Sequence, residues 1–263
     1  MSSELHAIQK PRWFYSTIQT RGTALVLHGI NMLPSRMDAI AGWLSANGID
    51  AYRAILSGHD GDMEAFKTAR RKDYIRDTLA AWQIVATRAA VANLPVHVVG
   101  FSFGALMAFD LLHSHPETHI ERAVLFAPAV APRLMTRVAL ALRPFPRFVP
   151  PSWSRPDFRM HPGAPIAAYT ALFASVRALH EARYCRANIP TLVFIDPQDA
   201  LVSLRQVRRL TEAYALDAWH VIPVTTNRGR LPGTYHHLIT EPDTLGEAQW
   251  QDVVAAMKAH LGL

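Results

Sequence analysis

A serine stands at the centre of the sequence Gly-Phe-Ser-Phe-Gly at residues 100–104, and its flanks suit covalent catalysis. An apolar, β-branched run, residues 96–99, precedes this pentapeptide, and a helical pattern begins at Ala105. A sharp strand-to-helix turn holds such a serine in a strained conformation and projects its hydroxyl from the end of the strand. The glycines are expected because a side chain there would collide with the neighbouring strand or helix. Ser102 is therefore the predicted nucleophile.

A nucleophilic serine also needs a base within hydrogen-bond reach and an acid that orients that base. Two aspartates, Asp196 and Asp199, follow an apolar run later in the chain. Two adjacent histidines, His236 and His237, come about forty residues after them, a spacing that leaves room for one helix and one strand. The residue types for a Ser–His–Asp arrangement are present, with two candidates for each partner of the serine.

The elements that must position these residues follow a repeated pattern of a short apolar run, a turn and an amphipathic stretch. This alternation is typical of parallel strands joined by crossover helices. We expect strands at residues 23–27, 51–56, 96–99, 123–126, 191–195 and 220–224. We expect helices at residues 65–92, 105–113, 166–179 and 246–261. The predicted fold class is α/β, with a mostly parallel central sheet flanked by helices.

The segment between the fourth and fifth expected strands, residues 127–188, is too long for a simple crossover. It is dense in proline, which breaks helices into short pieces. We expect it to form a small cap over the carboxyl-terminal edge of the sheet, where open α/β sheets bind ligands. Residues 1–263 are thus predicted to form a single domain with a cap insertion.

The chain resembles the α/β-hydrolase superfamily in three motifs. These are His28-Gly29 after the first expected strand, Ser-Gly-His at residues 57–59, and the serine pentapeptide. The likeness is greatest to the carboxylesterase, monoacylglycerol lipase and lysophospholipase branch, and it extends from about Thr23 to the end, weakest in the cap. Members often have Gly-His-Gly where this chain has Asp60 as the third residue. The resemblance implies the α/β-hydrolase fold and ester hydrolysis at a serine, with no cofactor and no metal.

The resemblance also implies the catalytic acid. Residues 189–202 are similar to the family stretch in which a strand leads to a loop that bears an aspartate shortly before a valine. This similarity places Asp199 at the catalytic position, with Val202 after it. Asp196 is then expected to form the turn before Pro197.

The same resemblance leaves two candidates for the base. Residues 233–242 are similar to the family motif Gly-x-Tyr-His-x-Leu-Leu-x-Glu-Pro, and this alignment makes His236 the catalytic histidine. Another branch ends the motif in His-x-Ile-Thr, an alignment that favours His237 instead. We take His236 as the predicted base and His237 as the alternative.

Acyl transfer passes through a tetrahedral oxyanion, which backbone N–H groups stabilise. The N–H of Phe103, directly after the nucleophile, is one expected donor. In the resembling family the second donor follows His-Gly, and here that residue is Ile30. We expect an apolar acyl pocket to be lined by Met32, Leu33, Phe145, Phe148, Trp153 and Tyr169.

The predicted function is hydrolysis of a carboxylic ester through an acyl-enzyme on Ser102. The resemblance favours a short- to medium-chain acyl ester or a monoacylglycerol. A thioesterase, an acyltransferase, an amidase or a carbon–carbon bond hydrolase would use the same three residue types, and the fold does not choose among them. Outside enzymes, the alternative is a protein that binds a small apolar ligand without catalysis.

The composition of the chain limits the classes of partner molecule that we expect. The 263 residues carry a net charge of +6, but the basic residues are spread along the chain, and we expect no nucleic-acid partner. The mildly basic surface is compatible with transient contact with anionic lipid, whereas no apolar run is long enough for stable membrane insertion. The N-terminal residues lack a signal-peptide pattern, and a single cysteine, Cys185, requires no oxidising compartment, so a cytoplasmic location is expected. The oligomeric state is not predicted.

Overall fold

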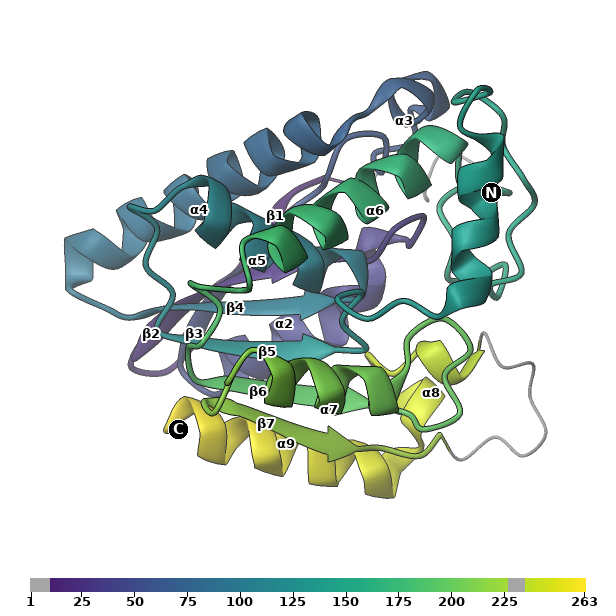
Figure 1. The fold of residues 1–263 in the computed structure, drawn as a ribbon. Helices are drawn as coiled ribbons and strands as arrows, with labels where there is room; N and C mark the ends of the chain where they lie inside the picture. Colours follow the sequence, from purple (N-terminus) through teal and green to yellow (C-terminus); the bar gives the residue numbers. More distant parts are fainter. Residues whose placement is uncertain (1–9, 227–234) are drawn as a thin grey trace.

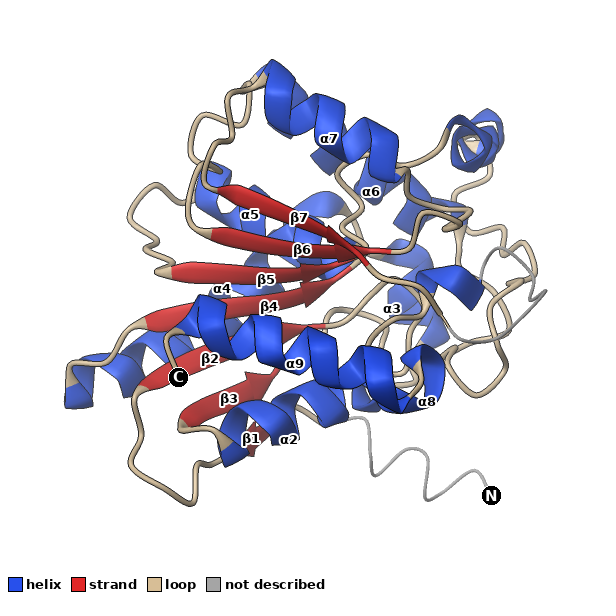
Figure 2. Ribbon diagram, turned by 90° about the horizontal axis from the view of Figure 1, so that it is seen from below, coloured by secondary structure: helices blue, strands red, loops and turns tan. Residues whose placement is uncertain are grey.

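The computed structural model describes residues 10–226 and 235–263, which form a seven-stranded sheet between two layers of helices (Figures 1 and 2). The strands lie in the order β1-β3-β2-β4-β5-β6-β7; β1 is antiparallel to β3, and all other neighbours are parallel. The strands are β1 (Arg12–Phe14), β2 (Gly22–Leu27), β3 (Ile49–Arg53), β4 (Val96–Phe101), β5 (Arg122–Phe126), β6 (Thr191–Ile195) and β7 (Trp219–Pro223). All six strands expected from the sequence are found.

The apolar runs are continuous because both faces of the sheet are buried. In β2, Leu25 and Leu27 belong to the core on one face of the sheet, whereas Ala24 and Val26 belong to the core on the other face. This alternation follows from the two-residue period of a strand. The sheet therefore has two hydrophobic cores, and each holds one layer of helices in place.

Helices α4 (Arg71–Ala92), α5 (Phe103–Ser114), α6 (Ile166–Glu181) and α7 (Leu204–Ala213) supply the first core. Helices α2 (Asp38–Ala46) and α9 (Glu247–Leu261) supply the second, on the opposite face (Figure 2). The remaining elements are α3 (Met63–Thr68), α8 (Pro242–Leu245) and the 3₁₀ segments η1 (Pro34–Met37), η2 (Leu134–Leu142) and η3 (Tyr235–His237).

The long helix expected at residues 65–92 is two helices, because side chains cap two separate starts. The carboxylate of Asp62 accepts from the N–H groups of Glu64 and Ala65 and begins α3. The carboxylate of Asp73 accepts from the N–H of Arg70, just before α4 begins. A continuous hydrophobic period across residues 65–92 conceals this break.

The segment between β5 and β6 divides into two parts. Residues 127–165, which we call the cap segment, lie over the carboxyl-terminal ends of the strands (Figure 1). Helix α6 instead packs against α4 and α5 in the helical layer, where Ala171, Val176 and Leu179 are buried. The sequence prediction counts residues 127–188 as one insertion, and within that range α6 also contacts η2 of the cap segment. No helix of the described residues is both long enough and apolar enough to cross a membrane.

Candidate active site

Ser102 occupies a strained turn between β4 and α5. Its φ is 50° and its ψ is −110°, and its N–H donates to the carbonyl of Phe126 on the neighbouring strand at 2.8 Å. A Cβ at Gly100 would lie 2.7 Å from the backbone of Ala105, and one at Gly104 would lie 2.5 Å from the carbonyl oxygen of Leu27. The two flanking glycines are thus required by the close approach of backbone, as the sequence indicates.

The imidazole of His237 lies between Ser102 and Asp199. Its Nε2 is 2.9 Å from the Ser102 Oγ, and its Nδ1 is 2.6 Å from Oδ2 of Asp199. All three side chains are buried, and the ring of Phe101 packs against the imidazole with centroids 4.9 Å apart. This is the order of contacts that activates a serine: hydroxyl, base and orienting acid.

The carboxylate of Asp199 is held by the loop that carries it. Its Oδ1 accepts from the N–H groups of Leu201 at 2.7 Å and Val202 at 3.0 Å, which leaves Oδ2 for His237. The guanidinium of Arg133, from the cap segment, donates to the carbonyl of Asp199 at 2.7 Å. The acid therefore has one fixed orientation toward the histidine.

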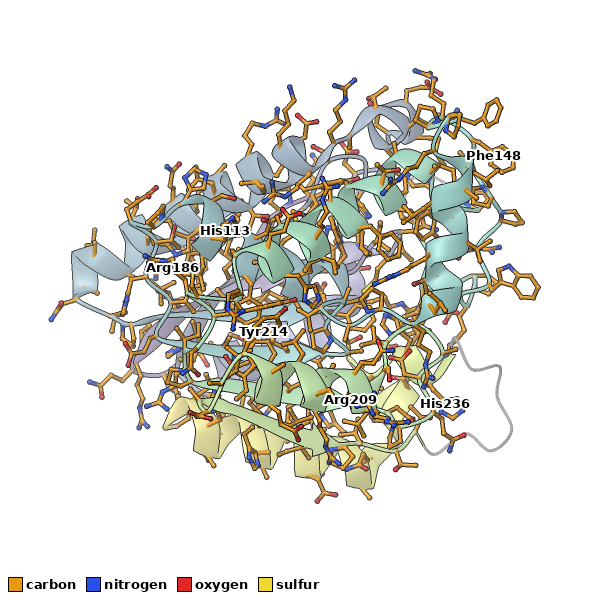
Figure 3. The ribbon with its side chains drawn as sticks, viewed as in Figure 1. His113, Phe148, Arg186, Arg209, Tyr214 and His236 are labelled. Carbon is orange, nitrogen blue, oxygen red and sulfur yellow. The ribbon has the colours of Figure 1, made fainter. Side chains whose placement is uncertain are left out.

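The structure does not bring His236 to Ser102. Its Nδ1 lies 3.0 Å from Oδ2 of Asp196 and 2.7 Å from Oγ1 of Thr226, in a buried cluster on the segment that leads to α8 (Figure 3). The contact with Ser102 predicted for His236 is made by the alternative, His237, and the geometry therefore favours His237 as the candidate base. Consecutive side chains in a 3₁₀ turn such as η3 point about 120° apart, so adjacent histidines cannot face the same partner.

The loop after β2 carries Ile30, the expected oxyanion donor, and is held from two sides. The N–H of the next residue, Asn31, donates to Nε2 of His59 at 2.8 Å. The side chain of Asn31 exchanges two hydrogen bonds with the backbone of His161 in the cap segment, accepting from its N–H and donating to its carbonyl. Asn31 has φ 51°, a left-handed conformation that these contacts stabilise.

His59 can hold this loop only as the neutral tautomer. Its Nδ1 donates to the carbonyl of Ser57 at 3.1 Å, so its Nε2 is free to accept from Asn31. Complete burial lowers the pKa of His59 well below the ordinary value, and the nearby ring of His28 lowers it further. The tautomer that positions the loop is therefore the stable one at neutral pH.

The backbone N–H groups of the two expected oxyanion donors are available to bind an oxyanion. Phe103 is the first residue of α5, and the first N–H groups of a helix have no partner within it. Within the described residues, neither Phe103 nor Ile30 donates its backbone N–H to an acceptor of the chain. The positive end of the α5 dipole also favours negative charge beside Ser102.

A cavity of about 210 Å³ adjoins Ser102 and His237. Its walls are mainly apolar and include Phe101, Phe158, Tyr169, Leu172, Phe173 and Leu201. Of the side chains expected in the acyl pocket, Met32, Trp153 and Tyr169 line it; Leu33 is buried elsewhere, and Phe145 and Phe148 are exposed on the cap segment.

Three contacts were not expected from the sequence: Asn31 with His59, Asn31 with His161, and His236 with Asp196. The Ser-Gly-His motif marks His59 but does not indicate its partner. His161 lies in a proline-rich stretch 130 residues from Asn31, and nothing in its local sequence signals this contact. Such cross-links depend on the folded path of the cap segment.

Comparisons with known proteins agree with this architecture. A hydrolase family model described as serine aminopeptidase, S33, matches residues 18–170. No curated protein matches the sequence significantly.

Among solved structures, a soluble variant of monoglyceride lipase from Saccharomyces cerevisiae is 13% identical, with a TM-score of 0.78, over 95% of this chain and 89% of that one. The monoacylglycerol lipase of Paleococcus ferrophilus is 20% identical, with a TM-score of 0.68, over 95% and 98%. A carboxyl esterase from Bacillus coagulans is 13% identical, with a TM-score of 0.61, over 82% and 84%. At these identities the likeness shows the fold alone, and that fold is the predicted α/β-hydrolase fold.

Proposed function

Because the chain belongs to the serine aminopeptidase S33 family of hydrolases, we propose that it cleaves carboxylic esters through an acyl-enzyme on Ser102. The observation that carries this proposal is the position of His237, whose two ring nitrogens lie 2.9 Å from the Ser102 Oγ and 2.6 Å from Asp199. The roles of Ser102 and Asp199 are those expected from the sequence, and His237 replaces His236 as the base.

In the proposed reaction the Oγ of Ser102 attacks the ester carbonyl carbon while Nε2 of His237 takes the hydroxyl proton. Asp199 accepts a hydrogen bond from Nδ1 and stabilises the imidazolium. The oxyanion receives hydrogen bonds from the N–H groups of Ile30 and Phe103. The C–O bond then breaks, and the imidazolium gives its proton to the leaving alcohol. Water attacks the acyl-enzyme by the same route and releases the acid.

The proposed substrate is a short- to medium-chain acyl ester or a monoacylglycerol. The apolar walls of the cavity, from Phe101 to Leu201, suit an acyl chain, and a cavity of about 210 Å³ limits its length. Burial raises the pKa of Tyr169, so its hydroxyl stays protonated and can donate to a polar group of the substrate. Monoglyceride lipases are also among the similar solved structures.

The family description names an aminopeptidase, and amide hydrolysis is the second candidate. An aminopeptidase must bind the free ammonium group of its substrate, which a carboxylate does best. Within the described residues, the side chains that line the cavity include no carboxylate. This lining favours an uncharged acyl group over an amino-acyl group.

The test is hydrolysis of p-nitrophenyl esters of graded acyl length, with amino-acyl p-nitroanilides in parallel. We expect turnover of the esters with an optimum at short to medium length, and none of the anilides. Ser102→Ala must abolish turnover, because otherwise the hydrolysis arises at another site. Turnover of the anilides alone would reject the esterase and support the aminopeptidase.

A further inference from the structure

Large apolar side chains are exposed mainly on the cap segment. Six of the ten that are exposed in the described residues lie there, and we call these six the cap surface: Leu134, Val138, Leu142, Phe145, Phe148 and Trp153. Trp153 is 82% exposed and Leu134 is 73% exposed. Figure 3 shows Phe148 at the outer end of the molecule. Apolar side chains gathered in this way mark an interaction site more often than a free surface.

The cap surface is also basic. Residues 127–165 contain six arginines and one carboxylate, Asp157. Arg137 and Arg143 are exposed, and within the part of the chain that the structure describes they form no ion pair. Their charges therefore remain available to a partner.

A basic groove continues from the cap surface toward the start of α4. Lys67, Arg70, Arg71, Arg143 and Arg147 line it. The carboxylate of Glu64 pairs with both Lys67 and Arg147, and Asp110 pairs with Arg71. Two carboxylates thus face five cationic side chains, and the groove has an excess of positive charge.

The same surface is connected to the site of reaction. Trp153 is exposed and also lines the cavity that holds Ser102. A partner seated on the cap surface would therefore lie at one wall of that cavity. Exposed aromatic side chains next to arginines match a surface with an apolar interior and anionic headgroups.

We propose that the cap surface docks onto lipid that contains anionic headgroups. Its apolar side chains, such as Phe145 and Phe148, enter the headgroup layer, and Arg137 and Arg143 contact lipid phosphates. Long arginine side chains suit this position, because their stems pack on apolar groups while the guanidinium stays hydrated. Docking does not require the proposed hydrolysis, so the two proposals can fail separately.

The test is co-sedimentation of the full chain with phosphatidylcholine vesicles, with and without phosphatidylglycerol, in a Ser102→Ala background that prevents turnover. We expect binding only with phosphatidylglycerol, and a decrease in binding as salt rises. Arg137→Gln and Arg143→Gln should each weaken binding about fivefold. Phe145→Ser and Phe148→Ser should each weaken it about tenfold.

Matched control variants separate this surface from general properties of the chain. Val91→Ser removes an exposed apolar side chain of α4, and Arg209→Gln removes a charge from α7, away from the cap segment (Figure 3). We expect both controls to bind as tightly as the parent protein. Equal loss in the controls, or no binding to phosphatidylglycerol vesicles, would overturn the proposal. So would a dimer in analytical ultracentrifugation that Phe148→Ser dissociates, because a second copy would then cover the surface.

Discussion

Two aspartate–histidine pairs lie side by side in this protein, and only one reaches the serine. Asp199 contacts His237 at 2.6 Å and Asp196 contacts His236 at 3.0 Å, and all four side chains are buried. The first pair continues to Ser102, whereas the second ends at Thr226. The comparison shows that residue type, burial and pairing with a carboxylate do not distinguish a base from a structural histidine. The direction in which each side chain leaves the turn η3 distinguishes the two histidines.

The second pair links two segments of the chain near the site. His236 connects η3 to the end of β6, because Asp196 follows that strand directly. Asp196 also accepts from the N–H of Gln198 and from Thr226, so it links the loop after β6 to the residue directly before His237. We regard His236 as a positioning residue that keeps the neighbouring imidazole in line with Ser102.

Replacement of each histidine in turn should give the largest difference in kcat between the two pairs. His237→Ala removes the base, and we expect kcat on a p-nitrophenyl ester to fall about 10⁴- to 10⁶-fold. His236→Ala should cost only about 10- to 100-fold, because it shifts the geometry and leaves the chemistry in place. Steady-state kinetics on both variants make the comparison. A larger loss for His236→Ala would reverse the assignment.

Replacement of the two aspartates should reproduce the contrast at smaller amplitude. Asp199→Asn cannot stabilise the imidazolium, and we expect kcat to fall about 10⁴-fold. Asp196→Asn keeps one acceptor oxygen for the backbone and should lower kcat less than about 100-fold. Circular dichroism provides the control, since both variants should keep the fold. Equal losses would mean that neither carboxylate is specific to the base.

His59 offers a third contrast, between a histidine that acts on the oxyanion loop and the two that pair with aspartates. His59→Ala frees the N–H of Asn31, and we expect kcat to fall about 10- to 100-fold with little change in KM. His59→Gln supplies an acceptor oxygen and should recover part of this loss. If the glutamine variant behaves like the alanine variant, the hydrogen bond to Asn31 does not position the loop.

Buried histidines without a carboxylate should make stability depend on pH. Burial lowers the pKa of His28 and of His97 to about 4, whereas the unfolded chain binds protons near pH 6.5. Between those values the unfolded state holds more protons, so the free energy of unfolding falls as pH decreases. From pH 7 to pH 5 we expect a loss of about 2 kcal/mol for each histidine.

Urea denaturation at the two pH values measures this loss. His97→Leu should remove the share of His97, about 2 kcal/mol. The substitution breaks no hydrogen bond at Nδ1, because that atom has no partner in the described structure. A pH dependence that is unchanged in His97→Leu would show that other groups cause it.

The sequence was sufficient for the parts of the molecule that depend on local pattern. The strands at residues 23–27 and 191–195 can be predicted because burial of both faces gives continuous apolar runs. The turn at Ser102 can be predicted from its flanking glycines. Asp199 is indicated over Asp196 by the resemblance to the hydrolase family stretch. The structure brings Ser102 and Asp199 together, and their catalytic roles stay proposals.

The remaining features depend on directions and contacts that no local pattern encodes. The motif around residues 233–242 aligns in two registers, and only the turn of η3 distinguishes His236 from His237. Its first residues, 233 and 234, lie outside the described part of the chain. The contact of Asn31 with His161, and the boundary between the cap segment and α6, depend on how distant segments pack.

The most direct test of the central claim is covalent labelling with an alkyl fluorophosphonate, followed by peptide mass spectrometry. Attack by a serine on phosphorus expels fluoride and leaves a stable phosphonyl adduct, and it requires the base that activates the hydroxyl. We predict an adduct on Ser102 in the wild type and in His236→Asn, and none in His237→Asn. An adduct on another residue, or equal labelling of Ser102 in His237→Asn, would contradict a nucleophile activated by His237.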